Sequence, residues 1–371
     1  MPTYQPKEPA VGPGAFFGRE LLVRNLTRGL EGGRNFVLIG GPALGKTSTL
    51  YQVASQFRLR WSRDPGETKL VPIVLDVSSW KLDPRSVAEA LWEQIDGALT
   101  HPQIAGPVAD RVKFQAKRGE DPFVALRTAL AELSRTLRGT AGWSRYVLLL
   151  DNADPLSERQ HEPILRFLSE LQVEDTPYAP VAIVLSGGRL LRESLRERRS
   201  PIRRYRLMTL TVFRESEALA LIKRGLSHLP EKSMHSVLSL SGQHPGILVR
   251  MLGEIETRGV QEDPRVIATE LSGDLATVWT RIWNEFDMAR RVTYRGAYAA
   301  PEHALMQLAM DLRQPLTVKL AERELAIRPL KEYAEFLEYT GVVEGNLVAG
   351  EPMFSAGGTL WNSWYGERIR R

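Results

Sequence analysis

The sequence contains no cysteine among its 371 residues. This excludes a disulfide framework, a thiolate metal site and a cysteine nucleophile, and it fits a reducing compartment. No apolar run approaches the length that crosses a bilayer; the longest have the size of a core strand, such as YVLLL at 146–150. Residues 1–20 are rich in Pro and Gly and lack the charged-then-apolar order of a secretory signal. We therefore expect a cytoplasmic protein with no membrane partner.

The composition is otherwise ordinary for a globular protein. Hydrophobic residues make up 43% and charged residues 25% of the chain, which excludes wholesale disorder. The length exceeds what one hydrophobic core usually supports, so we expect two or three domains. The net charge is +5, and the excess is local, because eight arginines and two glutamates lie between Arg189 and Arg206. Such a patch suits an anionic partner but does not require one.

A glycine-rich segment at 40–47 fits the pattern G-x-x-x-x-G-K-[ST] in full. A short apolar run at 35–39 precedes it, and a stretch with helical spacing of apolar residues follows it. Strand, glycine turn and helix form the arrangement in which backbone N–H groups and a helix dipole hold phosphates. The flanks therefore favour a nucleotide site over a chance glycine turn. The predicted nucleotide-binding residues here are Gly40, Gly41, Pro42, Ala43, Leu44, Gly45, Lys46, Thr47 and Ser48.

Two side chains of this segment have predicted roles toward ATP and Mg²⁺. Lys46 neutralises the β- and γ-phosphates, and the Thr47 hydroxyl ligates the magnesium ion. A second magnesium ligand is expected at the end of another buried strand, and the apolar run before Asp151 supplies it. The alternative for Asp151 is an ordinary cap at a strand end. The six histidines show no metal-binding spacing, so we infer no other metal.

The residues after Asp151 bear on the rate of hydrolysis. A carboxylate close to the magnesium aspartate usually polarises the attacking water. Here the adjacent residue is Asn152, which cannot take a proton, and the next acid is Asp154. We therefore predict slow hydrolysis, with Asp154 as the only local candidate for the base.

Strand and helix patterns alternate up to about residue 212. Because this alternation is typical of parallel sheets, we predict an α/β fold with a doubly wound sheet. Ligands of such sheets lie at the carboxyl ends of the strands, where residues 40–47, Asp151 and Ser186 would converge. The predicted strands are 69–80, 145–151, 180–189 and 205–210, and the predicted helices are 86–99 and 121–139.

From about residue 213 the pattern is helical as far as 286. A final block from about 300 has three helices and a predicted hairpin around residues 344–346, a pattern typical of a winged helix. Its aromatic tail, with Trp361, Trp364 and Tyr365, is expected to form core. The predicted parts are an N-terminal extension (1–15), a P-loop ATPase domain (16–212), a helical lid (213–290) and a winged-helix domain (291–371).

These motifs, in this order, resemble the STAND class of P-loop ATPases, which is related to AAA+ ATPases. They are most similar to the archaeal-type ATPase family with a C-terminal winged helix. FFGRE at 16–20 resembles a family box whose arginine lies along the adenine, which implies that role for Arg19. SGGR at 186–189 resembles a sensor strand end and implies a polar role for Ser186 near the γ-phosphate. SGQHPGILVRML at 241–252 resembles a G-x-P motif and implies that Pro245 packs on the adenine side.

The segment 200–218 resembles the family stretch that leads through an arginine into the helical lid. The resemblance implies that Arg204 contacts the γ-phosphate as an arginine finger does, with Arg189 and Arg203 as alternatives. Two other interpretations of the arginine cluster stay open. It is a solvated face, or it is a patch that binds nucleic-acid phosphates.

Two departures from the family pattern favour a switch over a motor. Asn152 stands where an AAA+ motor has its catalytic glutamate, and Pro155 stands where relatives have another glutamate. No appended repeat or effector domain is recognisable. We therefore expect an ATP-binding switch whose ATP or ADP state controls the binding of an unidentified protein partner or effector, or nucleotide-dependent homo-oligomerisation.

The alternative is an ATP-dependent DNA-binding loader or regulator that uses the winged helix and the Arg189–Arg206 patch. The expected recognition helix, residues 328–341, offers two cations against three glutamates. Acids on that face repel a duplex, because cation–phosphate contacts dominate DNA binding. The sequence therefore favours a winged helix that packs as a lid or carries protein contacts, and DNA is the less favoured partner.

Overall fold

The computed structural model describes residues 4, 10, 16–63, 69–99, 114, 119–141, 143–171, 181–286, 292–348 and 351–370. The chain forms two compact units. The sheet unit comprises Val11–Ile39 and Lys46–Met208, and the helical unit comprises Met1–Ala10, Gly40–Gly45 and Thr209–Arg371. The glycine-rich segment Gly40–Gly45 therefore belongs to the helical unit, although the chain on both sides of it belongs to the sheet unit.

The sheet unit contains a five-stranded sheet in the order β2-β3-β4-β1-β5. The first four strands along the chain pair in parallel. Both β1 and β4 are buried along their whole length, which explains their unbroken apolar sequences. The predicted α/β fold with a doubly wound parallel sheet is confirmed. The strands are β1 (Phe36–Ile39), β2 (Lys69–Asp76), β3 (Trp143–Asp151), β4 (Val181–Gly187) and β5 (Arg206–Thr209).

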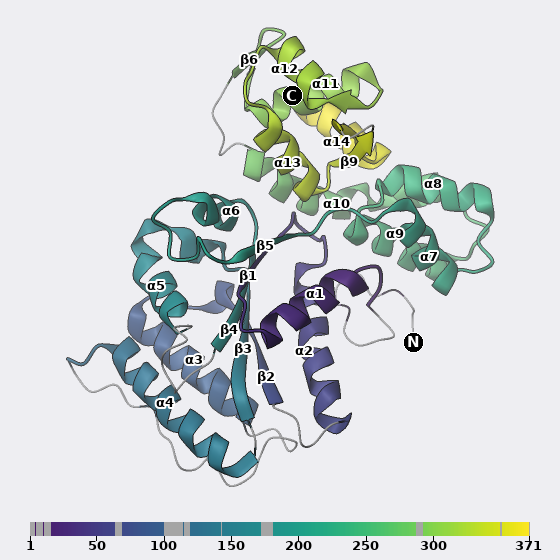
Figure 1. Ribbon diagram of the computed structural model, residues 1–371. Coiled ribbons are helices and arrows are strands. Elements are labelled where there is room, and N and C mark those ends of the chain that lie inside the picture. The colour runs from purple at the N-terminus through teal and green to yellow at the C-terminus, as the bar shows by residue number, and fades with distance from the viewer. Residues whose placement is uncertain are drawn as a thin grey trace. The chain divides into compact units, whose positions relative to one another are not determined.

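Helices cover both faces of this sheet (Figure 1). One face carries α1 (Glu20–Glu31) and α2 (Lys46–Arg63), and the other carries α3 (Pro84–Leu99), α4 (Pro122–Ala141) and α5 (Glu162–Glu170). The start of α4 follows from its sequence, because the Asp121 carboxylate accepts the N–H of Phe123 at 2.8 Å and a proline opens the helix. A short helix, α6 (Arg189–Arg196), joins β4 to β5.

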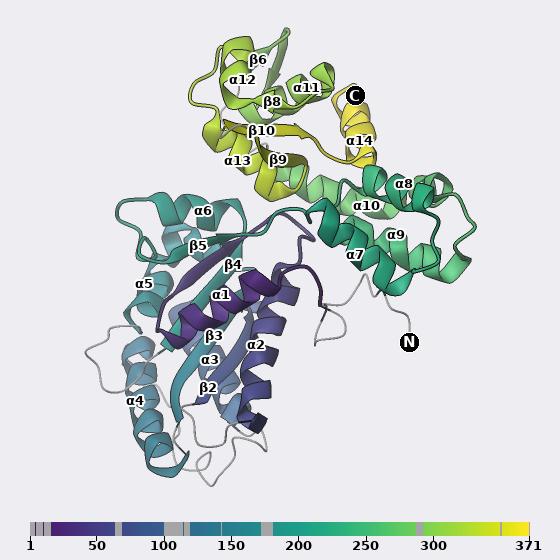
Figure 2. The same cartoon turned by 45° about the vertical axis from the view of Figure 1, so that its right-hand side comes forward.

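The helical unit contains the predicted all-helical segment, whose helices are labelled in Figure 2. Gly242 ends the second of its helices in a left-handed conformation, φ 59°, which glycine adopts without penalty. Tyr4 is buried, and its hydroxyl donates to the Leu221 carbonyl at 2.9 Å. The four helices are α7 (Glu215–Gly225), α8 (Glu231–Ser241), α9 (Pro245–Arg258) and α10 (Pro264–Phe286).

The last part of the helical unit has the expected three helices followed by a hairpin. The helices are α11 (Pro301–Leu312), α12 (Val318–Leu325) and α13 (Lys331–Thr340). The hairpin consists of β9 (Val343–Val348) and β10 (Glu351–Ala356), and β8 (Leu316–Thr317) completes an antiparallel sheet. A two-stranded ribbon of β6 (Val292–Tyr294) and β7 (Ala297–Ala299) precedes α11.

The hairpin turn was predicted at the wrong place. Residues 344–346 lie inside β9, because the two strands stay paired from Val343 with Ala356 to Val348 with Glu351. The residues between the two strands, 349–350, lie outside the described residues. The aromatic tail forms a helix that was not predicted, α14 (Thr359–Arg370), and Trp361 is buried in it as expected for core. No helix in the described ranges is both long enough and apolar enough to cross a membrane.

Candidate functional site

The glycine-rich segment joins β1 to α2 with an unusual backbone. Gly45 has φ 90°, and a Cβ placed on it would meet nothing within 4 Å. Its backbone conformation, and not crowding, therefore calls for glycine. Ala43 also has a positive φ of 59°, which residues with side chains rarely adopt. Lys46 then begins α2, so the N-terminal N–H groups of an 18-residue helix follow the turn directly.

Three predicted side chains lie together at the carboxyl ends of the strands. The Thr47 hydroxyl donates to Oδ2 of Asp151, and the Ser186 hydroxyl donates to Oδ1 of the same carboxylate at 2.8 Å. Asp151 is 4% exposed and Ser186 is fully buried. The parallel sheet creates this cluster, because the carboxyl ends of its strands meet at one edge.

This cluster fits a magnesium ion. Mg²⁺ prefers oxygen ligands and takes only one or two from the protein beside water and phosphate. The Thr47 hydroxyl and the Asp151 carboxylate already lie within hydrogen-bonding distance of each other, so one cation can reach both. Within the described ranges, no group of three or more His, Cys, Asp and Glu residues could hold a metal ion. A site here would therefore depend on nucleotide and water for its remaining ligands.

Asp154, the predicted base, caps a helix. Its Oδ2 accepts the N–H of Gly188 at 2.7 Å, and its Oδ1 accepts the N–H of Leu191 at 3.2 Å. Burial raises the pKa of the Asp154 carboxyl, although these N–H groups and the charge of Lys46 oppose the rise. Both oxygens are therefore engaged by the first turn of α6.

A carboxylate that sequence reasoning missed lies at the same sheet edge. Asp76 is the last residue of β2, and its register partner on β3 is Asp151. The Asn152 side-chain amide donates to Oδ1 of Asp76 at 3.0 Å, and the Ser78 N–H and hydroxyl donate to the same oxygen at 3.0 and 2.7 Å. Partial burial would raise the pKa of Asp76, but these hydrogen bonds outweigh it and lower that pKa. The signal in the sequence was an acid that ends an apolar strand, as Asp151 does.

The remaining predicted residues differ in their surroundings. Arg19 is half-buried and directly precedes α1. Pro245 is buried and opens α9, and a Cβ on the next residue, Gly246, would lie 2.6 Å from Cβ of Ala43. The start of α9 therefore packs on the glycine-rich segment. Arg204 is exposed before β5 and forms no hydrogen bond or ion pair with any residue that the structure describes.

The glycine-rich segment also contacts the end of α13 and the residue that follows it, residues 339–341, which we call the C-terminal turn. The Gly41 N–H donates to the Tyr339 carbonyl at 2.6 Å. A Cβ on Gly41 would lie 2.5 Å from the Thr340 carbonyl oxygen, so this approach requires glycine. Gly341 has φ 80°, and a Cβ there would lie 2.9 Å from the His244 ring. Within the helical unit, both α9 and the C-terminal turn therefore hold the segment that is expected to bind phosphate.

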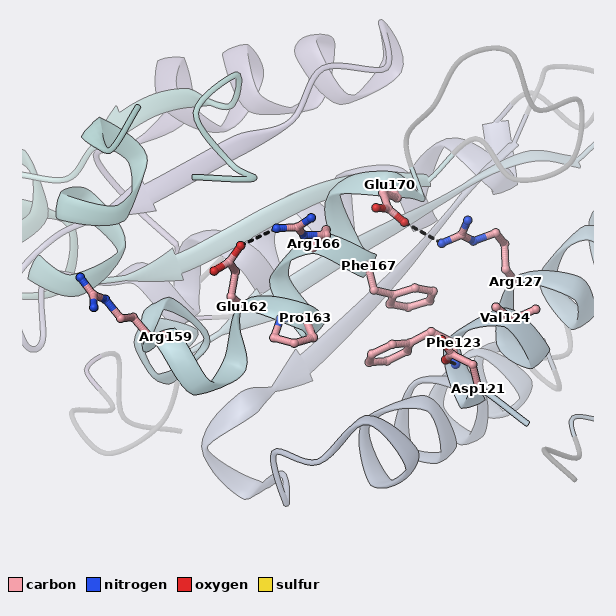
Figure 3. Close-up of a pocket in the computed structure, with 10 residues that line it drawn as sticks. All are labelled: Asp121, Phe123, Val124, Arg127, Arg159, Glu162, Pro163, Arg166, Phe167 and Glu170. Carbon is pink, nitrogen blue, oxygen red and sulfur yellow. Dashed lines mark hydrogen bonds and ion pairs between the residues drawn. The ribbon is translucent and has the colours of Figure 1, made fainter. Parts of the chain in front are cut away.

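A separate hollow of about 470 Å³ lies between α4 and α5 (Figure 3). The rings of Phe123 and Phe167 stack there with centroids 4.2 Å apart. Arg127 pairs with Glu170 at 2.8 Å, and a second arginine–glutamate pair lies within α5. None of the predicted site residues lines this hollow.

The chain is similar in three dimensions to a Walker-type ATPase of Pyrococcus abyssi, with a TM-score of 0.60 and 15% identity over 97% of this chain and 99% of that one. Aeropyrum pernix ORC1, solved in complex with DNA, gives a TM-score of 0.47 and 15% identity over 95% and 93% of the two chains. A STAND protein with a tetratricopeptide-repeat sensor from Pyrococcus horikoshii gives 0.38 and 13%, over 97% of this chain and 43% of that one. The sequence matches no protein-family model and no curated protein. This likeness shows that the chain shares its fold with the Pyrococcus abyssi Walker-type ATPase, as the sequence motifs implied.

Proposed function

We propose that this protein is a switch that binds ATP, hydrolyses it slowly and changes the packing of its winged-helix part with the nucleotide state. The observation that carries the proposal is the hydrogen bond from the Gly41 N–H to the Tyr339 carbonyl, 2.6 Å long. It joins the first turn of the phosphate segment to the C-terminal turn.

This contact couples nucleotide to the winged helix. Phosphates bind through the backbone N–H groups of a glycine-rich turn, and the backbones of Gly41 and Thr340 lie too close together to admit a Cβ on Gly41. A phosphate that moves the turn therefore changes the free energy of the contact, and the contact changes phosphate affinity by the same factor. A nucleotide shifts the two states only through its different affinity for them. ADP would favour the packed form, and ATP with a trigger would favour an open form that binds a protein partner or a second copy.

The proposed roles follow the site geometry and the family resemblance. Lys46 neutralises the phosphates, while Thr47 and Asp151 hold the magnesium ion, which supplies Lewis-acid stabilisation of the transferring phosphoryl group. Ser186 provides a polar contact near the γ-phosphate. From the resemblance alone, Arg19 and Pro245 flank the adenine and Arg204 senses the γ-phosphate.

DNA binding is the second candidate, and the exposure of the basic patch favours it. Six of its arginines are exposed: Arg196, Arg198, Arg199, Arg203, Arg204 and Arg206. Against it, Glu332 is exposed on α13, and the C-terminal turn is already engaged with Gly41. Salt-dependent retention on a random duplex, lost when these arginines are replaced by alanine, would favour DNA binding over the switch.

The nucleotide content of freshly purified protein tests the switch. The protein is denatured, and its nucleotide is resolved by anion exchange, with Lys46→Ala as control. We expect near-stoichiometric ADP that is absent from the control, because a switch holds its product until a trigger arrives. An empty site in protein that turns over added ATP quickly would contradict the switch and support a motor or a DNA loader.

A further inference from the structure

The carboxylate best placed to act on the attacking water is not the one nearest to Asp151 in the sequence. Asp154 has both oxygens bound by backbone N–H groups of α6. A Cβ on Gly187 would lie 2.6 Å from its Oδ2, so the carboxylate is packed against β4 as well. A group that orients water must have a lone pair that the water can reach. Both oxygens of Asp154 already accept backbone N–H groups, so neither has a readily accessible lone pair.

Asp76 meets these requirements. Its Oδ1 is anchored by three hydrogen bonds from Asn152 and Ser78. Its Oδ2 accepts no hydrogen bond from any residue that the structure describes, and the side chain is exposed. One oxygen is thus fixed, and the other is open to water.

The position of Asp76 relative to the magnesium ligand also fits. Asp76 and Asp151 are register partners on neighbouring parallel strands, and such strands lie about 4.8 Å apart. Side chains at paired positions project from the same face of a sheet. Asp76 therefore lies one strand beyond the proposed metal ligand, on the side away from β4.

We propose that Asp76 is the catalytic residue that positions the water which attacks ATP, and that Asn152 is a positioning residue that holds Asp76. The proposal rests on the proposed ATP hydrolysis. The water oxygen forms a bond to the γ-phosphorus while the bond from that phosphorus to the bridging oxygen breaks, and the electron pair of that bond leaves with ADP. Oδ2 of Asp76 accepts a hydrogen bond from the water, whose proton ends on the released phosphate.

With this assignment, the role of the Asn152 side chain is to hold Asp76 in place. Its φ is 52°, a left-handed conformation in which asparagine is several-fold enriched. The chain leaves the line of β3 at this residue, and the amide then reaches across to Asp76 on β2. Asn152, which stands where an AAA+ motor has its catalytic glutamate, therefore holds a carboxylate on the neighbouring strand.

The test compares Asp76→Asn with wild-type protein in three measurements: kcat and KM, the affinity for ATP, and the nucleotide bound after incubation with ATP. The variant keeps an oxygen that accepts the Ser78 N–H, so the local turn is preserved. We expect kcat to fall about 100-fold while ATP affinity stays within about twofold. The bound nucleotide should change from mostly ADP to mostly ATP, a readout that does not depend on turnover assays.

Two further variants sharpen the test. Asn152→Gly accommodates the positive φ and removes only the amide, so kcat should fall about tenfold with ATP affinity unchanged. Asp83→Asn is the matched control, because Asp83 also accepts a backbone N–H, from Ser86 at 3.0 Å, but caps α3. We expect its kcat to equal that of the wild type.

The outcomes separate this inference from the proposed function. Turnover by Asp76→Asn within about threefold of wild type, with Lys46→Ala inactive, would overturn the inference and leave the ATPase intact. If the melting temperature of Asp76→Asn is well below that of the wild type, the Asn152→Gly variant becomes the deciding test. An unchanged kcat in Asn152→Gly then overturns the proposal. If wild-type protein holds ATP without ever converting it to ADP, the proposed hydrolysis fails, and this inference fails with it.

Discussion

The sheet unit and the helical unit hold their predicted site residues by different means. The sheet unit supplies side chains: Thr47, Asp151 and Ser186 join through a carboxylate and two hydroxyls. The helical unit holds Gly40–Gly45 through main-chain contacts, such as the 2.6 Å hydrogen bond from Gly41 to Tyr339. Chemistry that resides in side chains is visible as motifs in a sequence. Close contacts between backbones show in a sequence only as glycines, and a glycine can occur for many other reasons.

The largest expected effect tests the side-chain half of this comparison. Asp151→Asn removes the charge that would hold magnesium, and loss of metal stabilisation is worth several kcal/mol. We expect kcat to fall about 10³-fold, because each 1.4 kcal/mol changes a rate tenfold. Steady-state ATPase assays over a range of Mg²⁺ concentrations measure this. Full activity in the variant would show that Asp151 is only a cap for its neighbours.

An intermediate effect tests the main-chain contacts of the helical unit. It compares two glycines that share a backbone conformation. Gly341 and Gly296 have φ of 80° and 81°, so alanine at either position carries a similar left-handed strain of about 1 kcal/mol. Only at Gly341 would the new Cβ meet the His244 ring. We therefore expect Gly341→Ala to release bound ADP faster by about tenfold, while Gly296→Ala releases it at the wild-type rate.

Dissociation of a fluorescent ADP analogue, followed after addition of excess ADP, measures both variants. Equal rates in the two would mean that the C-terminal turn does not influence nucleotide, and the proposed coupling would have to be abandoned.

The smallest expected effect compares two carboxylates of the sheet unit across pH. The pKa of Asp76 is lowered, so its contribution to stability is present above the unfolded Asp pKa of about 3.9 and is lost as pH falls through the folded pKa. The pKa of Asp154 is raised, so its contribution is present below about pH 3.9 and is lost as pH rises through the folded pKa.

Urea unfolding between about pH 3 and 7 measures the difference in free energy of unfolding between wild type and each variant. With rising pH, this difference should increase for Asp76→Asn and decrease for Asp154→Asn. A decrease with rising pH in both variants would show that burial dominates at Asp76 too, and that its hydrogen bonds do not hold it ionised.

Parts of the site that are local in the chain were predictable. The segment 40–47 and the apolar runs of β3 and β4 indicated where Thr47, Asp151 and Ser186 would meet, and the structure joins all three. The sheet was predictable for the same reason, because strands buried on both faces have unbroken apolar sequences. The roles of Arg19 and Arg204 remain predictions.

One error arose where strand pairing overrode a local signal. Glu344-Gly345-Asn346 reads as a turn, yet cross-strand pairing with β10 extends β9 through it. Asp154 was predicted as the base because it is three residues from Asp151, and that role stays a prediction. The structure adds that its oxygens accept N–H groups at the start of α6, and that the register of β2 brings Asp76 to the same edge.

The sequence by itself determined the α/β fold and the meeting of Thr47 with Asp151, since these depend on the order of residue types along short stretches. Only the tertiary structure decided that Asp154 caps α6, that Asn152 reaches Asp76, and that Gly41 meets the C-terminal turn. Those contacts join residues far apart in the chain through single hydrogen bonds of fixed length and direction. Such geometry exists only once the strands and helices have packed.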